Sequence, residues 1–137
     1  MRIRALLLVV LGVLAQAALS APAEERPALK GVSAVRISNY GAPSALVRDR
    51  EDVRSIVEEL AELRKKAWRR GDTKMRCYAT VVLLVKEKPL ALFRVRPEYV
   101  VERPVEKEQS SFTLVVDETD LPKLRKMLTE IPPGKCQ

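Results

Sequence analysis

The feature that most constrains the fold is one long amphipathic segment, DREDVRSIVEELAELRKKAWRRG, at residues 49–71. Asp49 suits the N-cap of a helix, and Gly71 suits the left-handed residue that ends one. Apolar residues recur at the three-and-four spacing of one helix face, namely at Val53, Ile56, Val57, Leu60, Leu63, Ala67 and Trp68. A helix of this length extends for roughly 30 Å, about the length of a nine-residue strand, so we expect a sheet of long strands beneath its apolar face.

Arg64 is the exception within this apolar face, because it lies between Leu60 and Trp68. A charged residue at such a position either extends along apolar surface until its head reaches water, or meets an acid of the sheet or of a partner. We favour the first arrangement, which is the usual one.

The rest of the chain has the composition of strands, followed by a second helix. The strand segments are 32–38, both arms of a hairpin within 75–96, 99–102 and 112–116, with a short extra strand at 45–48. The second helix has capping residues at 117–120 and an apolar face at Leu121, Leu124, Leu128 and Ile131. This order, β-α-β-β-β-α, predicts one α+β domain at residues 32–137, with a four- or five-stranded antiparallel sheet and two α-helices packed mainly on one face.

The hairpin decides which side of the sheet the helices cover. We place Val85 opposite Leu90, because a loop at 87–88 or 86–89 gives that register. One face then holds Tyr78, Thr80, Val82, Leu84, Ala91, Phe93 and Val95, and the other holds Cys77, Ala79, Val81, Leu83, Val85, Leu90, Leu92, Arg94 and Arg96. Since the first face has no charge, we predict that the helices cover it.

The second face would then remain open, with aliphatic side chains beside arginines. Exposed surfaces of this kind are typical of protein contacts. The predicted partner-binding residues are Val81, Leu83, Leu92, Arg94 and Arg96. The alternative is that the lead-in, the loop at 103–111 or the C-terminal tail folds over this face, and the sequence favours neither arrangement.

The first residues have the organisation of a secretory signal peptide. Arginines precede an uncharged apolar run at residues 5–19, and small residues follow it. We predict cleavage after residue 20, within the range 17 to 23, and a flexible lead-in at residues 21–31. A retained signal anchor is the alternative, although the run is short for a bilayer span of about 20 residues. Cleavage removes two arginines and no acid, so the net charge of +7 becomes +5.

Export gives a role to the two cysteines, Cys77 and Cys136. Disulfides persist in oxidising compartments, so we predict a bridge between them in a periplasmic or secreted protein. A loop of about 60 residues would contribute about 4 kcal/mol in the chain-entropy model. The alternative is two separate thiols.

The chain offers few groups for catalysis. It contains no histidine, which excludes the usual serine and cysteine triads and removes the commonest zinc ligand. It has no Gly-rich phosphate loop, and the acidic residues 117–120 lack the pattern of a calcium loop. Carboxylate-pair hydrolysis stays open, because the sequence does not give distances between acids. We predict no catalytic residue, no metal and no cofactor.

A basic run is the strongest charge feature and includes Arg64, Lys65, Lys66, Arg69, Arg70, Lys74 and Arg76. Such residues compensate the negative end of a helix dipole, or they form a patch that attracts anions. Nucleic acid is the weakest interpretation, because an exported protein is separated from it.

Together these features predict a small exported, non-enzymatic protein of the inhibitor or immunity-protein type, which binds a protein partner in the cell envelope. A homodimer is compatible with the same open face. The alternative function is an envelope-associated binder of a phosphate-bearing lipid or polysaccharide, through the basic end of the first helix.

Overall fold

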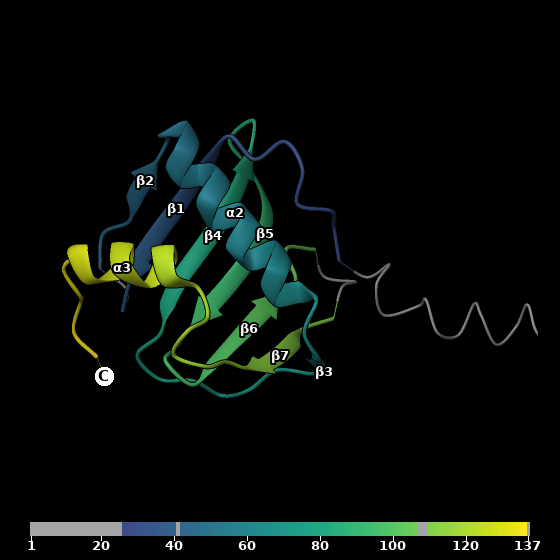
Figure 1. Cartoon of the computed structure of the whole chain (residues 1–137). Helices are drawn as coiled ribbons and strands as arrows, with labels where there is room; N and C mark the ends of the chain where they lie inside the picture. The colour runs from purple at the N-terminus through teal and green to yellow at the C-terminus, as the bar shows by residue number, and fades with distance from the viewer. Residues whose placement is uncertain (1–25, 41, 107–109, 137) are drawn as a thin grey trace, which may run out of the picture.

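The structure, a computed structural model, describes residues 26–40, 42–106 and 110–136, and it has two layers (Figure 1). One layer is an antiparallel sheet, and the other consists of two helices over one face of that sheet. The elements are β1 (Ala34–Asn39), β2 (Ala45–Val47), α2 (Arg50–Arg64), β3 (Arg69–Arg70), β4 (Ala79–Val85), β5 (Lys88–Val95), β6 (Tyr99–Arg103), β7 (Phe112–Val115) and α3 (Pro122–Glu130). The predicted signal peptide at 1–20 lies outside the described residues.

The sheet has seven strands in the order β2-β1-β4-β5-β6-β7-β3, and all of its pairings are antiparallel. The predicted α+β class and the two helices on one face are confirmed, whereas the number of strands is higher than the predicted four or five. At one edge β2, with three residues, corresponds to the short extra strand predicted at 45–48, and at the other edge β3, with two residues, was not predicted. A strand of two residues leaves no periodic pattern in a sequence.

The first helix starts where predicted and ends earlier. The carboxylate of Asp49 accepts a hydrogen bond from the Asp52 backbone N–H at 3.0 Å, which caps the first turn. The helix ends at Arg64, and the Leu63 carbonyl in its last turn accepts hydrogen bonds from the Lys66 backbone N–H at 3.1 Å and from the Trp68 indole N–H at 2.9 Å. The residues after Trp68 then leave the helix direction and form β3 beside β7.

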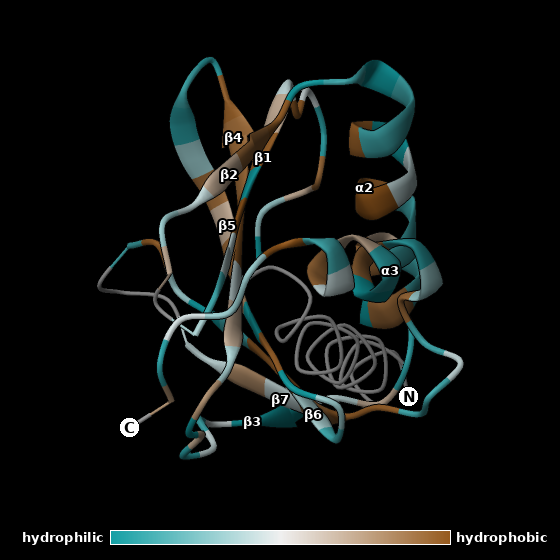
Figure 2. Cartoon of the chain, turned by 90° about the vertical axis from the view of Figure 1, so that its left-hand side faces the viewer, coloured by the Kyte–Doolittle hydropathy of each residue, from teal (hydrophilic) through white to brown (hydrophobic). Residues whose placement is uncertain are grey.

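The core lies between the helices and one face of the sheet, and the hydropathy colouring shows apolar segments of both layers turned toward each other (Figure 2). Helix α2 buries Val53, Ile56, Leu60 and Leu63. They belong to one cluster with Val35, Ile37, Val81, Leu83, Ala91 and Phe93 of the sheet. Leu121 and Leu124 add the contribution of α3.

The predicted face of β4 was wrong, and a register irregularity between β4 and β5 explains why. Lys86 and Glu87 both have left-handed backbone conformations, with φ of 50° and 68°, so Val85 pairs with Lys88. An irregularity follows between Leu83 and Leu84, after which Leu83 pairs with Ala91 and Val81 with Phe93. Because a shift of one residue moves a side chain to the opposite face, Val81 and Leu83 face the helices, whereas Val82 and Leu84 face away.

A disulfide and a backbone hydrogen bond hold the C-terminal tail against the domain. Cys77 and Cys136 form a disulfide with a Cα–Cα distance of 5.1 Å, which confirms the predicted bridge. Gly134 donates its N–H to the Asn39 carbonyl at 2.9 Å, and a Cβ at this position would lie 2.4 Å from the Tyr40 carbonyl oxygen. The tail therefore lies directly against the end of β1.

The described part of the predicted lead-in contacts the rest of the domain. Leu29 and Val32 pack against the core cluster, and the Pro27 carbonyl accepts a hydrogen bond from Arg64 at 2.5 Å. Residues 26–31 thus lie along the domain, while residues 21–25 fall outside the described chain.

Candidate functional site

The face of the sheet opposite the helices, which we call the reverse face, has two rows of side chains that cross several strands. Cross-strand partners place Leu46, Arg36, Val82, Leu92 and Arg103 in the first row. The second row contains Ser38, Thr80, Arg94, Val101, Thr113 and Arg69. Neither row contains an acid, so every charged side chain of the two rows is an arginine.

Apolar side chains are exposed at both ends of the reverse face. Leu46 on β2 is 45% exposed. Tyr99 and Val115 pair with each other across β6 and β7, and they are 38% and 72% exposed. Val82 and Leu92, in the middle of the first row, are partly exposed.

The arginines of this face differ in how far they are already engaged. Arg103 forms an ion pair with Asp72. The guanidinium of Arg94 lies 4.7 Å from the centre of the Tyr78 ring, which is a cation–π contact. Arg36 is exposed. Arg36 and Arg94 are therefore the cations of this face that are best placed to meet a partner.

The chain itself covers part of the reverse face. The connector at 71–78 joins β3 to β4, and its Thr73 hydroxyl donates to the Thr113 hydroxyl at 3.0 Å. Val101 on β6 is fully buried, and Thr113 on β7 is 4% exposed. The predicted alternative of internal cover thus applies to the region around β6 and β7, whereas the Leu46, Arg36, Val82 and Leu92 part of the first row keeps exposed surface.

The predicted partner-binding residues separate into three groups. Val81 and Leu83 are 0% exposed in the core beneath α2, so they cannot contact a partner, and the shifted hairpin register is the reason. Leu92 and Arg94 lie on the reverse face. Arg96 donates to the Arg76 and Cys77 carbonyls at 2.5 and 3.2 Å, so it holds the connector.

Sequence reasoning missed Arg36, Leu46 and Val82. The first two lie on strands that the sequence did identify, but their row becomes visible only once the register between β1, β2 and β4 is known. The irregularity beside Leu83 and Leu84, which moves Val82 to this face, is not marked by a glycine in either strand.

The predicted anion-binding residues do not form one patch. Lys65 pairs with Glu62 at 2.7 Å, Lys66 pairs with Asp120, and Arg69 donates to the Thr73 hydroxyl at 3.0 Å. The guanidinium of Arg70 lies 6.0 Å from the Phe112 ring centre. Lys74 and Arg76 are exposed on the connector.

Arg64 forms a buried ion pair, so the prediction that its head reaches water was wrong. Its Nε and Nη2 donate to the two carboxylate oxygens of Glu102 at 3.0 and 2.5 Å. Arg26 joins them, with its guanidinium 3.8 Å from Glu102 and 4.7 Å from the centre of the Phe112 ring. Burial lowers the pKa of Arg26, and the charge of Glu102 opposes that shift. This cluster fastens the lead-in to α2 and the sheet.

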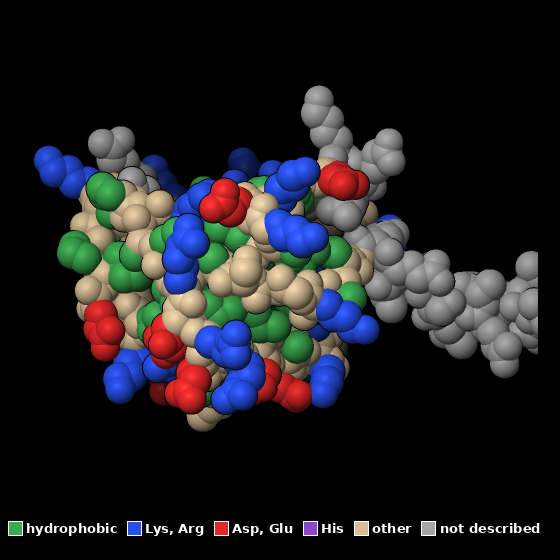
Figure 3. All heavy atoms as spheres, turned by 90° about the horizontal axis from the view of Figure 1, so that it is seen from above, with side chains coloured by type: hydrophobic (Ala, Val, Ile, Leu, Met, Phe, Trp, Pro, Cys, Tyr) green, Lys and Arg blue, Asp and Glu red, His purple; other side chains and the backbone are tan. Residues whose placement is uncertain are grey.

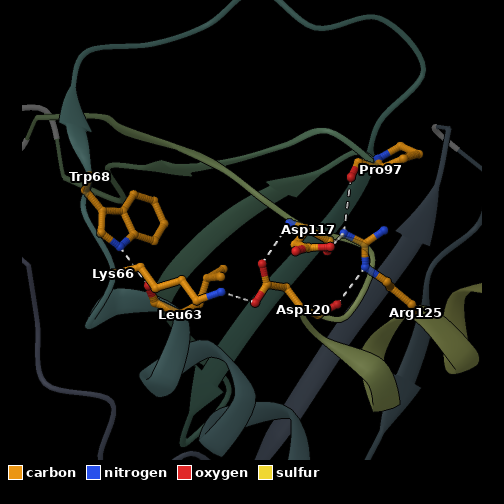
Figure 4. Close-up of polar contacts among 7 residues, drawn as sticks. All are labelled: Leu63, Lys66, Trp68, Pro97, Asp117, Asp120 and Arg125. Carbon is orange, nitrogen blue, oxygen red and sulfur yellow. Dashed lines mark hydrogen bonds and ion pairs between the residues drawn. The ribbon is translucent and has the colours of Figure 1, made fainter.

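A second polar network joins the end of α2 to the start of α3 (Figure 4). Asp120 forms an ion pair with Lys66 and accepts a hydrogen bond from the Asp117 N–H at 2.8 Å. Arg125 donates to the Asp120 and Pro97 carbonyls at 2.7 and 3.3 Å. The hydrogen bond from Lys66 is the main reason why the pKa of Asp120 lies below its usual value.

The acids at 117–120 therefore shape a turn, and the predicted capping of α3 by them was wrong. Glu59 of α2 replaces them, because its carboxylate accepts from the Lys123 and Leu124 N–H groups at 2.8 and 3.0 Å. No group of three or more potential metal ligands occurs among residues 26–40, 42–106 and 110–136.

The chain matches no protein-family model, no curated protein and no solved structure. Within the described part of the chain, neither helix has the length and apolar composition that crossing a membrane requires.

Proposed function

We propose that this protein is a small exported, non-enzymatic domain that binds a protein partner through the reverse face, in the manner of an inhibitor or immunity protein. The observation that supports this most directly is the row of Leu46, Arg36, Val82 and Leu92, where aliphatic side chains flank an exposed arginine. Arginine beside apolar surface is the composition that protein interfaces favour.

The charge of the face defines the partner more closely. Since neither row contains an acid, the complementary surface is apolar and presents carboxylates opposite Arg36 and Arg94. A second copy of the same face would oppose arginine with arginine. We therefore favour an acidic partner over the homodimer.

Export and the absence of catalysis belong to the same proposal. The Cys77–Cys136 disulfide is compatible with an oxidising compartment such as the periplasm. Among residues 26–40, 42–106 and 110–136 the most buried carboxylate is that of Glu102, which has both oxygens bonded to Arg64, and Glu59 is bonded to backbone N–H groups. Acids held in this way are poorly placed to transfer protons to a substrate.

The alternative, anion binding by the basic end of α2, receives less support. Arg64, Lys65 and Lys66 each form an ion pair with an acid, which reduces the field that a phosphate group would meet.

Capture of the partner from envelope extract, with oxidised protein lacking residues 1–20 as bait, tests the proposal. We expect one captured protein to be lost with Leu46→Asp and with Arg36→Glu, because each change places negative charge within the first row. Lys126→Glu on the exposed surface of α3 is the control, and it should retain the partner. Equal capture by all variants would exclude the reverse face as the binding surface.

A further inference from the structure

A groove separate from the reverse face lies between the lead-in and the first two turns of α2. Its volume is about 530 Å³. The lining residues are Leu29, Gly31, Val32, Ser33, Arg48, Arg50, Val53, Arg54, Val57 and Glu58. In the view from above, apolar side chains are visible between basic ones over this end of the molecule (Figure 3). Sites for small molecules commonly have volumes of roughly 300–1,000 Å³, so this groove has a suitable size.

The aliphatic residues of the groove continue into the core. Leu29, Val32 and Val57 are partly buried and pack against the core cluster, and Val53 belongs to that cluster. A hydrocarbon chain in the groove would thus contact side chains that already contact the interior. Its burial would be favourable in proportion to the apolar area removed from water.

The polar residues of the groove are mainly arginines. Arg50 and Arg54 are one turn apart on α2, and Arg48 follows β2. Arg48 lies 3.8 Å from Glu87 and Arg54 lies 3.9 Å from Glu58, in ion pairs whose members are all at least 66% exposed. Exposed pairs of this length contribute about 0–1 kcal/mol, so a ligand anion can compete for both guanidinium groups.

We infer that this groove binds a single-chain amphiphile with a carboxylate head, that is, a fatty acid. The aliphatic residues accept the chain, and the arginines bind the carboxylate by charge-assisted hydrogen bonds in the fork geometry that guanidinium groups favour. A single chain is preferred because the groove is lined by only four aliphatic side chains, Leu29, Val32, Val53 and Val57. This inference does not depend on the protein partner proposed above, because the two sites share no residue.

Titration with dodecanoate below its micelle concentration, followed by backbone amide NMR shifts, tests the site. We expect shifts at residues 29–33 and 48–58. The double variant R50Q/R54Q should bind at least about tenfold more weakly, since charged hydrogen bonds are lost. K74Q/R76Q removes the same charge from the exposed connector and should bind dodecanoate like the original protein.

Dodecyltrimethylammonium, with the same chain and a cationic head, separates charge recognition from apolar adsorption. We expect it to leave the groove amides unshifted. The inference is overturned if this cation shifts the same amides as strongly, if dodecanoate shifts only residues outside the groove, or if both double variants bind dodecanoate equally.

Discussion

Replacement of Glu102 by glutamine is the sharpest test of how the two layers are joined. Glu102 is 4% exposed, and it accepts two hydrogen bonds from Arg64 while Arg26 lies 3.8 Å away. The E102Q side chain keeps the shape of the acid and loses its charge, so two buried guanidinium groups lose the negative charge between them. Removal of one member of a buried ion pair costs about 3–5 kcal/mol.

We expect a loss of about 3 kcal/mol, the lower end of that range, because the amide oxygen still accepts one hydrogen bond. Domains of this size have unfolding free energies of about 5–15 kcal/mol, so the variant should still fold, with a clearly reduced free energy of unfolding. Urea denaturation measures the change. With a slope of about 2 kcal/mol per molar urea, the midpoint should fall by about 1.5 M.

The matched control is E62Q, which makes the same change in an exposed pair. Glu62 lies 2.7 Å from Lys65, and both side chains are 71% exposed. Such pairs contribute about 0–1 kcal/mol, so the urea midpoint should change little. If E102Q lowers the free energy of unfolding by no more than E62Q does, the cluster is not a source of stability. A double-mutant cycle of R64M and E102M should also give a coupling energy above about 1 kcal/mol.

Three further outcomes follow from contacts of the fold. Mutation of Cys136 to serine opens a loop with a sequence separation of 59, and thermal or urea unfolding should report a loss of up to about 4 kcal/mol. Mutation of Glu59 to alanine removes the cap of α3, so hydrogen exchange should accelerate in the first turn of that helix, with a stability loss of about 1–2 kcal/mol. Lys66 depresses the pKa of Asp120 below 3.8 in the folded state, so the contribution of Asp120 is present above that pH and is lost as the pH falls through the folded pKa. Acid unfolding should therefore show D120N less stable than the original protein at neutral pH, with the difference vanishing in strong acid.

The parts of the fold that depend on local chemistry could be predicted from the sequence. Asp49 caps α2 as expected, because an N-cap involves residues within one turn. The end of α2 was missed, since the Trp68 side chain folds back onto the Leu63 carbonyl and Arg64 has its acid on a strand 38 residues away. Long-range partners of this kind leave no pattern in a sequence.

The candidate site was predicted as a type of surface but not as a set of residues. An open face with arginine and aliphatic side chains exists, yet Val81 and Leu83 lie in the core and Val82 is found in their place on that face. Alternation along β4 identifies two faces without deciding which one the helices cover. That decision depends on the register irregularity between Leu83 and Leu84, where β5 has one extra residue, Leu90, between Pro89 and Ala91.

The disulfide also determines how the molecule responds to mechanical force. A pull on both ends of the chain passes from Cys77 to Cys136 through the sulfur atoms, so the 59-residue span between them bears no tension. At about 3.4 Å per extended residue, the closed loop withholds roughly 200 Å from the contour length that unfolding under force can release. Stretching single molecules in an optical trap should therefore give an extension shorter by this amount under oxidising than under reducing conditions. The elements β4 to β7 and α3 then lie within a closed loop that bears no tension.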